Sequence, residues 1–137
     1  MAYRLQFDSK QRVLLVIHEG EVRGWEIESL SDELRQRFSE LNPSTTISDF
    51  STATTVDVSA EMIRHLAKKD GSFPKTMRRF IVAPLDYMFG LARMYELSAH
   101  PPFAALQIVR RREEALAAIG TESLQLEPLV LSSPSAP

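Results

Sequence analysis

Hydrophobic and polar positions change their spacing along the chain, and each spacing predicts a different element. Residues 3–7 alternate between apolar and polar side chains, which is typical of a half-exposed strand at a sheet edge. Residues 13–17 form a continuous apolar run after a polar turn, so the two segments predict an antiparallel hairpin whose second strand ends at Gly20. From residue 23 to residue 41, apolar residues recur every three to five positions among charged residues, which predicts an amphipathic helix.

The rest of the chain repeats a unit of one strand followed by one helix. The predicted strands cover residues 45–50, 80–83 and 103–109, and the predicted helices cover residues 60–70, 87–97 and 111–119. Ser59 and Asp86 precede two of these helices, where their side-chain oxygens can cap the first turn. The run at residues 80–83 is apolar without interruption, which is the pattern of an inner strand covered on both faces. We therefore expect this strand and the helix after it to form the centre of the fold.

The predicted elements follow the order ββαβαβαβα and indicate the α/β class. Strands joined by single helices pair in parallel, so we expect a single mixed, mostly parallel sheet of five strands in which only the first strand is antiparallel. A chain of 137 residues with 44% hydrophobic residues is long enough for one core. We expect one domain over residues 1–120 and a tail, rich in serine, proline and leucine, over residues 121–137. Because exposed leucines are an aggregation risk, this tail is predicted to pack on its own domain or on a second copy.

Composition and charge exclude several classes of function. The net charge of −2 argues against a nucleic-acid binder, since phosphate contacts need concentrated Lys and Arg. Cysteine is absent, which excludes disulfides and thiolate catalysis and is typical of a reducing compartment. The sequence has no signal peptide and no apolar run of about 20 residues, so we expect a cytoplasmic protein without a membrane span.

Motifs for catalysis and cofactor binding are also missing. The three histidines, His18, His65 and His100, fall in different elements and lack the spacing of a metal site. The sequence contains no nucleophile elbow, no glycine-rich phosphate loop and no dinucleotide fingerprint. We therefore expect no metal, no other cofactor and no enzymatic activity.

The central helix carries more apolar residues than one sheet face requires. The candidate surface for a partner or ligand on this helix consists of Met88, Phe89, Arg93, Met94 and Tyr95. Gly90 interrupts the helix at a cost of about 1 kcal/mol relative to alanine, which predicts that another backbone or ring passes close to it. Two explanations stay open here. Either neighbouring helices cover the extra apolar side, or that side binds a protein partner, a second copy of the chain or a small apolar ligand.

A polar segment between the third strand and the next helix is the second candidate. It contains Asp49, Ser51, Asp57 and Ser59, which we interpret as a regulatory loop. Asp49 and Asp57 are the only paired carboxylates worth weighing for acid–base catalysis, but such a pair needs a dry pocket, and a loop of serine and threonine is wet. Turn formation by these side chains is the simpler explanation.

Two short basic clusters are predicted to be solvated edges of the sheet. They consist of Lys75, Arg78 and Arg79, and of Arg110, Arg111 and Arg112. If neighbouring strands carry both clusters at one edge, the alternative is a shared anion site.

The segments at residues 78–84 and 89–96, RRFIVAP and FGLARMYE, carry a family resemblance. The sequence resembles a group of uncharacterised bacterial proteins with the fold of STAS domains, the anti-sigma-factor antagonist fold. The likeness extends over about residues 3–119, with further matches at Gly20-Glu21, at Asp49-Phe50-Ser51 and at Glu114-Ala115-Leu116. It implies a small mixed sheet wound as a β-α superhelix, which matches the order of elements predicted above.

The resemblance also implies what the protein does. In the signalling branch of this fold a serine in an Asp-Ser-Ser-Gly-like motif accepts phosphate, and the nearest match here is Asp57-Val58-Ser59-Ala60. Valine stands at the phosphoacceptor position, so Ser59 is either a shifted acceptor or, more simply, a helix cap. The leading hypothesis is a non-catalytic regulatory or scaffolding module that binds a protein partner or itself as a homodimer. The alternative is a carrier of a small apolar ligand held between the central helix and the sheet.

Overall fold

The computed structural model describes residues 3–130 and contains six strands and four helices over that range. The strands are β1 (Tyr3–Asp8), β2 (Val13–Arg23), β3 (Thr45–Asp57), β4 (Arg78–Val82), β5 (Leu106–Val109) and β6 (Glu127–Pro128). The helices are α1 (Gly24–Leu41), α2 (Ala60–Asp70), α3 (Asp86–Leu97) and α4 (Arg112–Ala118). None of these helices has the length and hydrophobicity that crossing a membrane requires.

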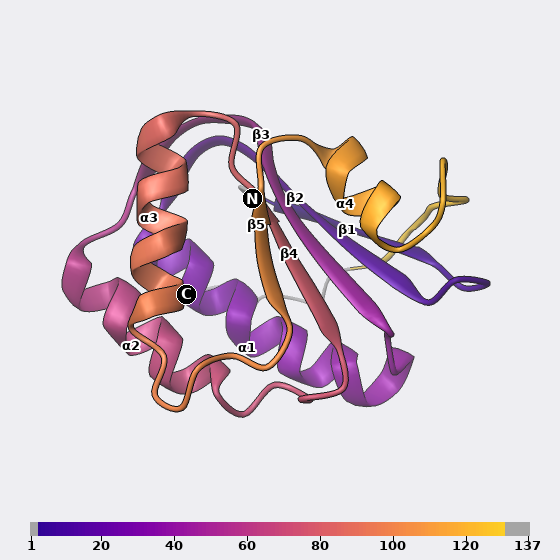
Figure 1. The fold of residues 1–137 in the computed structure, drawn as a ribbon, viewed down its shortest axis with the longest axis horizontal. Coiled ribbons are helices and arrows are strands. Elements are labelled where there is room, and N and C mark those ends of the chain that lie inside the picture. Colours follow the sequence, from indigo (N-terminus) through magenta and orange to yellow (C-terminus); the bar gives the residue numbers. More distant parts are fainter. Residues whose placement is uncertain (1–2, 131–137) are drawn as a thin grey trace.

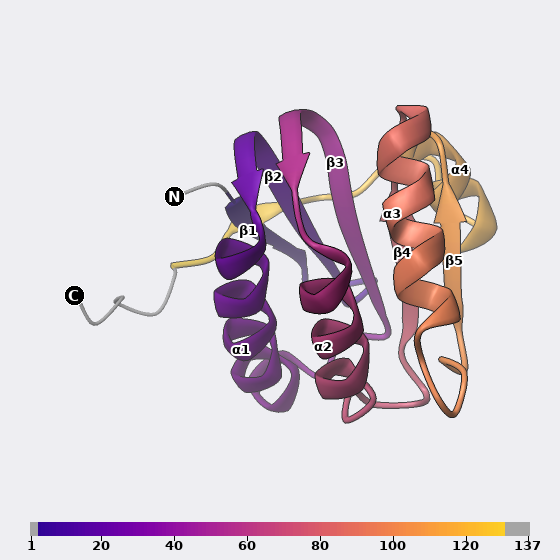
Figure 2. The ribbon, with the colours of Figure 1, turned by 90° about the vertical axis from the view of Figure 1, so that its left-hand side faces the viewer.

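All strands belong to one mixed sheet in the order β5-β4-β3-β2-β1-β6. β2, β3, β4 and β5 run parallel, whereas β1 is antiparallel to both β2 and β6. Helices α1, α2 and α3 cover one face of the sheet, and α4 lies on the other (Figures 1 and 2). The predicted α/β class and the mostly parallel sheet are confirmed, with six strands in place of five because β6 joins the edge at β1.

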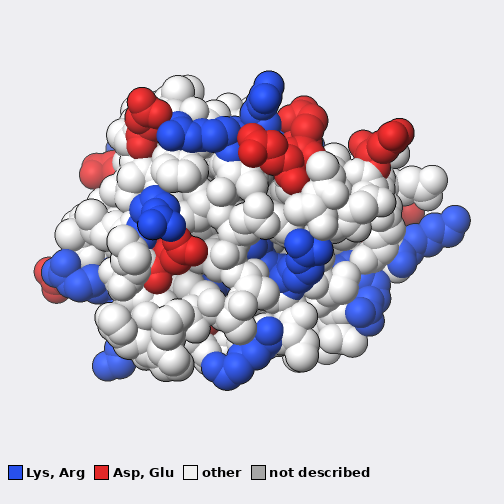
Figure 3. All heavy atoms as spheres, in the orientation of Figure 1, with Lys and Arg blue, Asp and Glu red and all other residues white. Residues whose placement is uncertain are grey.

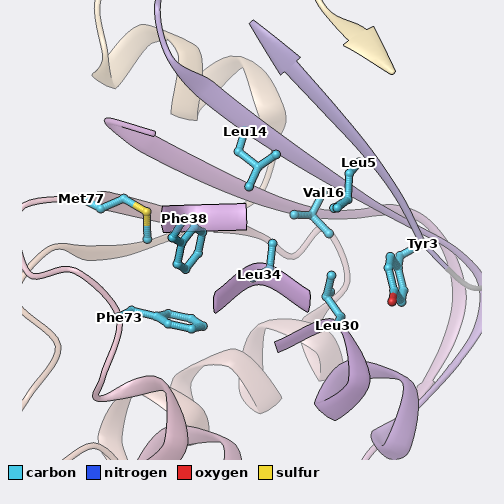
Figure 4. Packing of buried hydrophobic residues seen from close by; sticks show 9 residues of the cluster. All are labelled: Tyr3, Leu5, Leu14, Val16, Leu30, Leu34, Phe38, Phe73 and Met77. Carbon is cyan, nitrogen blue, oxygen red and sulfur yellow. The ribbon is translucent and has the colours of Figure 1, made fainter. Parts of the chain in front are cut away.

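The core has two faces because side chains of β2 alternate between them. On the face covered by three helices, Leu14 and Val16 of β2 meet Leu30, Leu34 and Phe38 of α1 (Figure 4). On the other face, the residues packed around Ala115 of α4 are Val13, Leu15, Ile17, Ile47, Phe80, Val82 and Val109. Both faces of the central strands are buried, which explains why these segments read as continuous apolar runs.

Strands β2 and β3 are longer than the sequence predicts. Gly20 does not end β2. It adopts a left-handed φ of +65° at a β-bulge, and the strand continues to Arg23. Residues Glu19–Arg23 pair with Thr52–Asp57, so most of the segment interpreted as a regulatory loop is strand.

Two other local predictions are wrong. Asp86 does not cap α3, because Leu85 occupies the N-cap and Asp86 lies in the first turn, where its carboxylate accepts a hydrogen bond from Arg110 at 2.8 Å. The last parallel strand begins at Leu106 and not at residue 103, because Phe103 turns away to stack on Tyr95.

Residues 121–130 lie against their own domain. The backbone amide of Leu129 donates to Leu5 at 2.9 Å, and that of Gln125 donates to the buried carboxylate of Asp8 at 2.7 Å. Leu124 and Leu126 pack near α4 on one face of the sheet, while Leu129 packs on the other. Residues 131–137 of the predicted tail lie outside the described residues, and the domain boundary at residue 120 stays a prediction.

Truncation after Gly120 is expected to lower the free energy of unfolding by about 3 kcal/mol or more. The truncated chain loses three partly buried leucines, and the carboxylate of Asp8 loses one of its backbone donors. Urea unfolding followed by circular dichroism measures the difference. Replacement of the exposed Glu122 with alanine keeps these contacts and should leave the midpoint unchanged, whereas an unaltered midpoint after truncation would contradict the prediction.

Candidate functional site

The five residues of the predicted α3 surface do not share one side of the helix. Met88 and Tyr95 are buried, whereas Arg93 and Met94 are exposed. Phe89 is half-buried, with the guanidinium of Arg110 placed 4.2 Å from its ring centroid. The sequence groups these residues because they lie on one helix. The structure divides them between an inner and an outer side of that helix.

The outer side of α3 carries an apolar stripe, which we define as Tyr87, Gly90, Met94 and Leu97. Its large side chains are 46%, 38% and 66% exposed at Tyr87, Met94 and Leu97 respectively. Among residues 3–130, a Cβ atom placed on Gly90 would meet nothing within 4 Å, so the prediction that another backbone or ring passes close to this glycine is wrong for the part of the chain that the structure describes. The glycine instead leaves a flat gap in the middle of the α3 stripe.

The inner side of α3 is covered by its neighbours and lines a cavity. Tyr95 and Leu91 pack against the apolar side of α2, so a neighbouring helix does cover part of the extra apolar surface. A cavity of about 120 Å³ remains between α1, α2, α3 and the sheet. Its walls are mainly apolar, and its polar side chains are those of His18, Ser31, Ser48, Asp70, Arg79 and Tyr95.

Asp70 is the centre of a buried hydrogen-bond network at one end of this cavity. Its carboxylate accepts hydrogen bonds from Ser31 at 2.5 Å and from the hydroxyl of Tyr95 at 2.6 Å. Arg35 donates to the same carboxylate at 3.3 Å, and Arg79 donates to the hydroxyl of Tyr95 at 2.6 Å. Burial raises the pKa of Tyr95, so this hydroxyl stays protonated and acts as a donor. The network joins α1, α2, α3 and β4.

Arg79 is held in an aromatic setting. Its guanidinium carbon lies 4.8 Å from the ring centroid of Phe73, 4.9 Å from that of Phe103 and 5.4 Å from that of Tyr95. These distances are typical of cation–π contacts. One guanidinium nitrogen, Nη1, is buried and has no hydrogen-bond partner within residues 3–130. Arg79 is therefore held in place but keeps an unused donor.

His18 is a buried neutral base at the end of the apolar run of β2. It is 2% exposed, and its ring stacks on Phe50 with the centroids 4.0 Å apart. Burial lowers the pKa of His18 from 6.5 to about 3, against the opposing effect of the charge on Asp49. The imidazole is therefore uncharged at neutral pH.

The candidate regulatory residues lie along β3 and at the start of α2. Asp49 is buried and accepts hydrogen bonds from Arg112 at 2.7 Å and from the amide of Ser51 at 2.8 Å. Asp57 is exposed at the far end of the same strand, so the two carboxylates do not form a pair. The hydroxyl of Ser59 accepts from the amide of Met62 at 3.0 Å, which confirms the predicted helix cap.

The two basic clusters lie at opposite ends of the neighbouring strands β4 and β5. Arg78 and Arg79 begin β4, whereas Arg110 to Arg112 follow the end of β5, and these strands are parallel. Arg110 and Arg112 pair with Asp86 and Asp49. A shared anion site built from both clusters is therefore wrong. Residues 3–130 also contain no group of three acidic or histidine side chains that could hold a metal ion.

Solved structures share this arrangement of strands and helices. The anti-sigma factor antagonist SpoIIAA in its unphosphorylated form has a TM-score of 0.55 at 14% identity, over 86% of this chain and 97% of that one. The phosphorylated form of SpoIIAA, a Bacillus cell fate determinant, has a TM-score of 0.53 at 14% identity, over 86% and 99% of the two chains. The chain has a STAS-like fold. An uncharacterised protein of the DUF3478 family with a SpoIIAA-like fold, from Shewanella loihica PV-4, has a TM-score of 0.55 at 12% identity, over 86% and 92%.

The resemblance seen in the sequence is thus confirmed for the fold. No protein-family model matches the chain, and no curated protein is similar to it in sequence. The hydroxyl of Ser59, the residue that the sequence offers as a shifted phosphoacceptor, caps α2. Phosphate transfer to Ser59 stays the less simple of the two alternatives that the sequence leaves open.

Sequence reasoning missed Asp70 and His18 as members of a site, and it placed Arg79 only in a basic cluster at the edge of the sheet. Asp70 did carry a signal, because a carboxylate at the C-terminal end of a helix opposes the helix dipole. A negative charge at that position needs compensation from elsewhere, and Arg35 and Arg79 supply it. No sequence feature identified His18 in the same way, because a residue of any kind can follow an apolar run in a strand.

Proposed function

We propose that this chain is a cytoplasmic, non-catalytic regulatory or scaffolding module that binds a protein partner or a second copy of itself through the α3 stripe. The exposure of Tyr87, Met94 and Leu97 on one side of a single helix is the observation that carries the proposal. Aromatic residues and methionine are enriched at the centres of protein interfaces. The absence of cysteine supports a reducing compartment.

The local chemistry of the stripe fits contact with another protein. Tyr87 is held in place because its hydroxyl accepts a hydrogen bond from the amide of Val56 at 3.1 Å, so less side-chain entropy is lost on binding. Gly90 lets a partner backbone approach the helix closely. Arg93 and Glu96 form an ion pair at 2.6 Å beside the stripe, which gives it a charged rim.

Replacing Gly90 with alanine is expected to stabilise the fold by about 1 kcal/mol and to weaken association. The added methyl group meets nothing in the chain and improves helix propensity, but it fills the gap that a partner would use. Thermal unfolding measures the first effect, and sedimentation velocity over a range of protein concentrations measures self-association. A variant that gains stability and associates as the wild type does would contradict a close approach at Gly90.

The proposal as a whole is tested by placing a charge in the stripe. If the partner is a second copy, Met94→Asp should reduce self-association. If the partner is another protein, the variant should no longer co-purify with the proteins that accompany the wild type from its own host. Ala117→Asp is the matched control, because Ala117 is exposed on α4 at the opposite face of the sheet. Equal behaviour of both variants and the wild type would reject the α3 stripe as an interface.

The cavity under α3 favours a second candidate function, the binding of a small apolar molecule. Its volume of about 120 Å³ approaches the roughly 150 Å³ of an engineered apolar cavity that binds benzene. Ala92 lines it, so Ala92→Leu would fill the space. Native mass spectrometry of protein from its own host should show a ligand in the wild type that the variant lacks, and a ligand-free wild type would reject this candidate.

A further inference from the structure

A second pocket, of about 350 Å³, opens at the edge of the sheet where β4 and β5 begin. Its walls are the C-terminal half of α2, the turn from α2 to β4, and the segment from α3 to β5. These two connecting segments lie side by side in both ribbon views (Figures 1 and 2). This volume lies at the lower end of the range for small-molecule sites. We call it the basic pocket.

The basic pocket gathers four cations, and three of them have no acidic partner among the described residues. Arg64, Lys68, Lys75 and Arg79 line it, and among residues 3–130 the first three form no ion pair. Asp70 is the only carboxylate among the described residues of its wall, and its oxygens already accept hydrogen bonds from Ser31 and Tyr95. Figure 3 shows Lys and Arg side chains along this lower edge of the molecule with little red beside them.

This concentration of positive charge is unusual for the protein. The whole chain has a net charge of −2, and most of its other arginines pair with acidic neighbours. Arg64 and Lys68 are four residues apart on α2, a spacing at which like charges repel. The helix dipole favours Lys68 in the last turn, but it explains neither Arg64 nor Lys75.

Arg79 adds a second, independent observation. Arg79 lines both this pocket and the cavity under α3, and its Nη1 atom is buried without a hydrogen-bond partner among the described residues. An unpaired buried donor is costly, and an oxygen of a bound anion would satisfy it. Phe73 and Phe103 also line the pocket and offer apolar contact beside the charges.

We propose that the basic pocket binds a small organic anion, with its phosphate or carboxylate group among Arg64, Lys68, Lys75 and Arg79 and its apolar part against Phe103. The anion balances the unpaired cations, and the apolar part displaces water from the aromatic wall. This site is separate from the α3 stripe and does not depend on the proposed function.

Phenyl phosphate is the probe that tests the proposal, because it combines both features in one molecule. Isothermal titration calorimetry should give an affinity at least tenfold higher for phenyl phosphate than for inorganic phosphate or for phenol. The double variant Arg64→Gln, Lys75→Gln should lower that affinity at least tenfold. Both side chains are exposed and unpaired, so an unchanged melting temperature should show that the variant is folded.

The matched control is Lys10→Gln, which removes an exposed cation from the β1–β2 turn, away from the pocket. It should bind phenyl phosphate as the wild type does. Equal affinity for phenyl phosphate and inorganic phosphate would show attraction by charge alone and would overturn the proposal. Wild-type affinity in the double variant, or no binding of any probe, would overturn it too.

Discussion

Replacing Asp70 with alanine is expected to lower the free energy of unfolding by about 3–5 kcal/mol. Asp70 is buried at the end of α2, and its carboxylate holds Ser31, Tyr95 and Arg35. Without it, the hydroxyls of Ser31 and Tyr95 lose an acceptor, and the largely buried guanidinium of Arg79 loses its nearby negative charge. Removing one member of a buried charged network leaves the remaining charge uncompensated, which costs more than the lost hydrogen bonds.

Two milder variants separate charge from hydrogen bonding in this network. Tyr95→Phe removes one hydroxyl and should cost only about 1–2 kcal/mol, because Asp70 keeps its contacts with Ser31 and Arg35. Asp70→Asn keeps the shape of the side chain, so its loss in free energy of unfolding should lie between those of Tyr95→Phe and Asp70→Ala. Urea unfolding of the three variants under identical conditions measures the order of their free energies of unfolding. A loss below about 1 kcal/mol in Asp70→Ala would mean that the network does not stabilise the fold.

The alternation and periodicity of apolar residues predicted most of the fold. Strands and helices differ in the spacing of their apolar residues, and the parallel order follows from single helices between strands. The first strand is not the edge that its alternation predicts, because β6 pairs outside it. The boundary of β3 was missed because residues 51–57 mix serine, aspartate and threonine, which signal turns as well as strands. The pairing with β2 explains why this segment is a strand. The bulge at Gly20 lets β2 continue, and the extension of β3 pairs with it.

The candidate site was predicted less well, because its contacts join residues far apart in the chain. Spacing identified an apolar α3 but not which of its sides meets α2, and this depends on tertiary packing. The network around Asp70 connects α2 to Ser31, 39 residues earlier, and to Tyr95, 25 residues later. No local pattern encodes such pairs. A polar residue in an unfavourable position, such as Asp70 at the end of a helix, is the only trace they leave in the sequence.

The Asp70 network connects the features on which the proposals rest. Arg79 lines the basic pocket, donates to Tyr95 of α3 and lies beside the cavity. Tyr95 is on the same helix as the α3 stripe but points inward, so the stripe and the pocket are joined through one buried side chain. Variants of the exposed Arg64 and Lys75 leave this link intact. They therefore test the pocket without disturbing the stripe.

The stability of the protein should depend on pH through His18. The pKa of this side chain is about 3 in the folded protein, against 6.5 when it is exposed. Between these values the unfolded chain binds a proton that the folded chain does not, so the free energy of unfolding falls as the pH falls below 6.5. The loss is about 1.4 kcal/mol per pH unit and reaches roughly 4 kcal/mol near pH 3.

His18→Phe should remove this dependence, because phenylalanine keeps the stack on Phe50 and does not titrate. Urea unfolding at pH values from 6.5 to 4.5 is the decisive measurement, since the lowered pKa of Asp8 affects stability only at more acidic pH. Ser48→Ala is the control, because Ser48 lines the cavity and its side chain does not titrate. Its free energy of unfolding should change with pH as that of the wild type does. If the free energies of unfolding of the wild type and His18→Phe change equally with pH, the imidazole takes up a proton inside the folded protein. Asp49 is the neighbouring charge that favours that protonated form, so Asp49→Asn would then identify the cause.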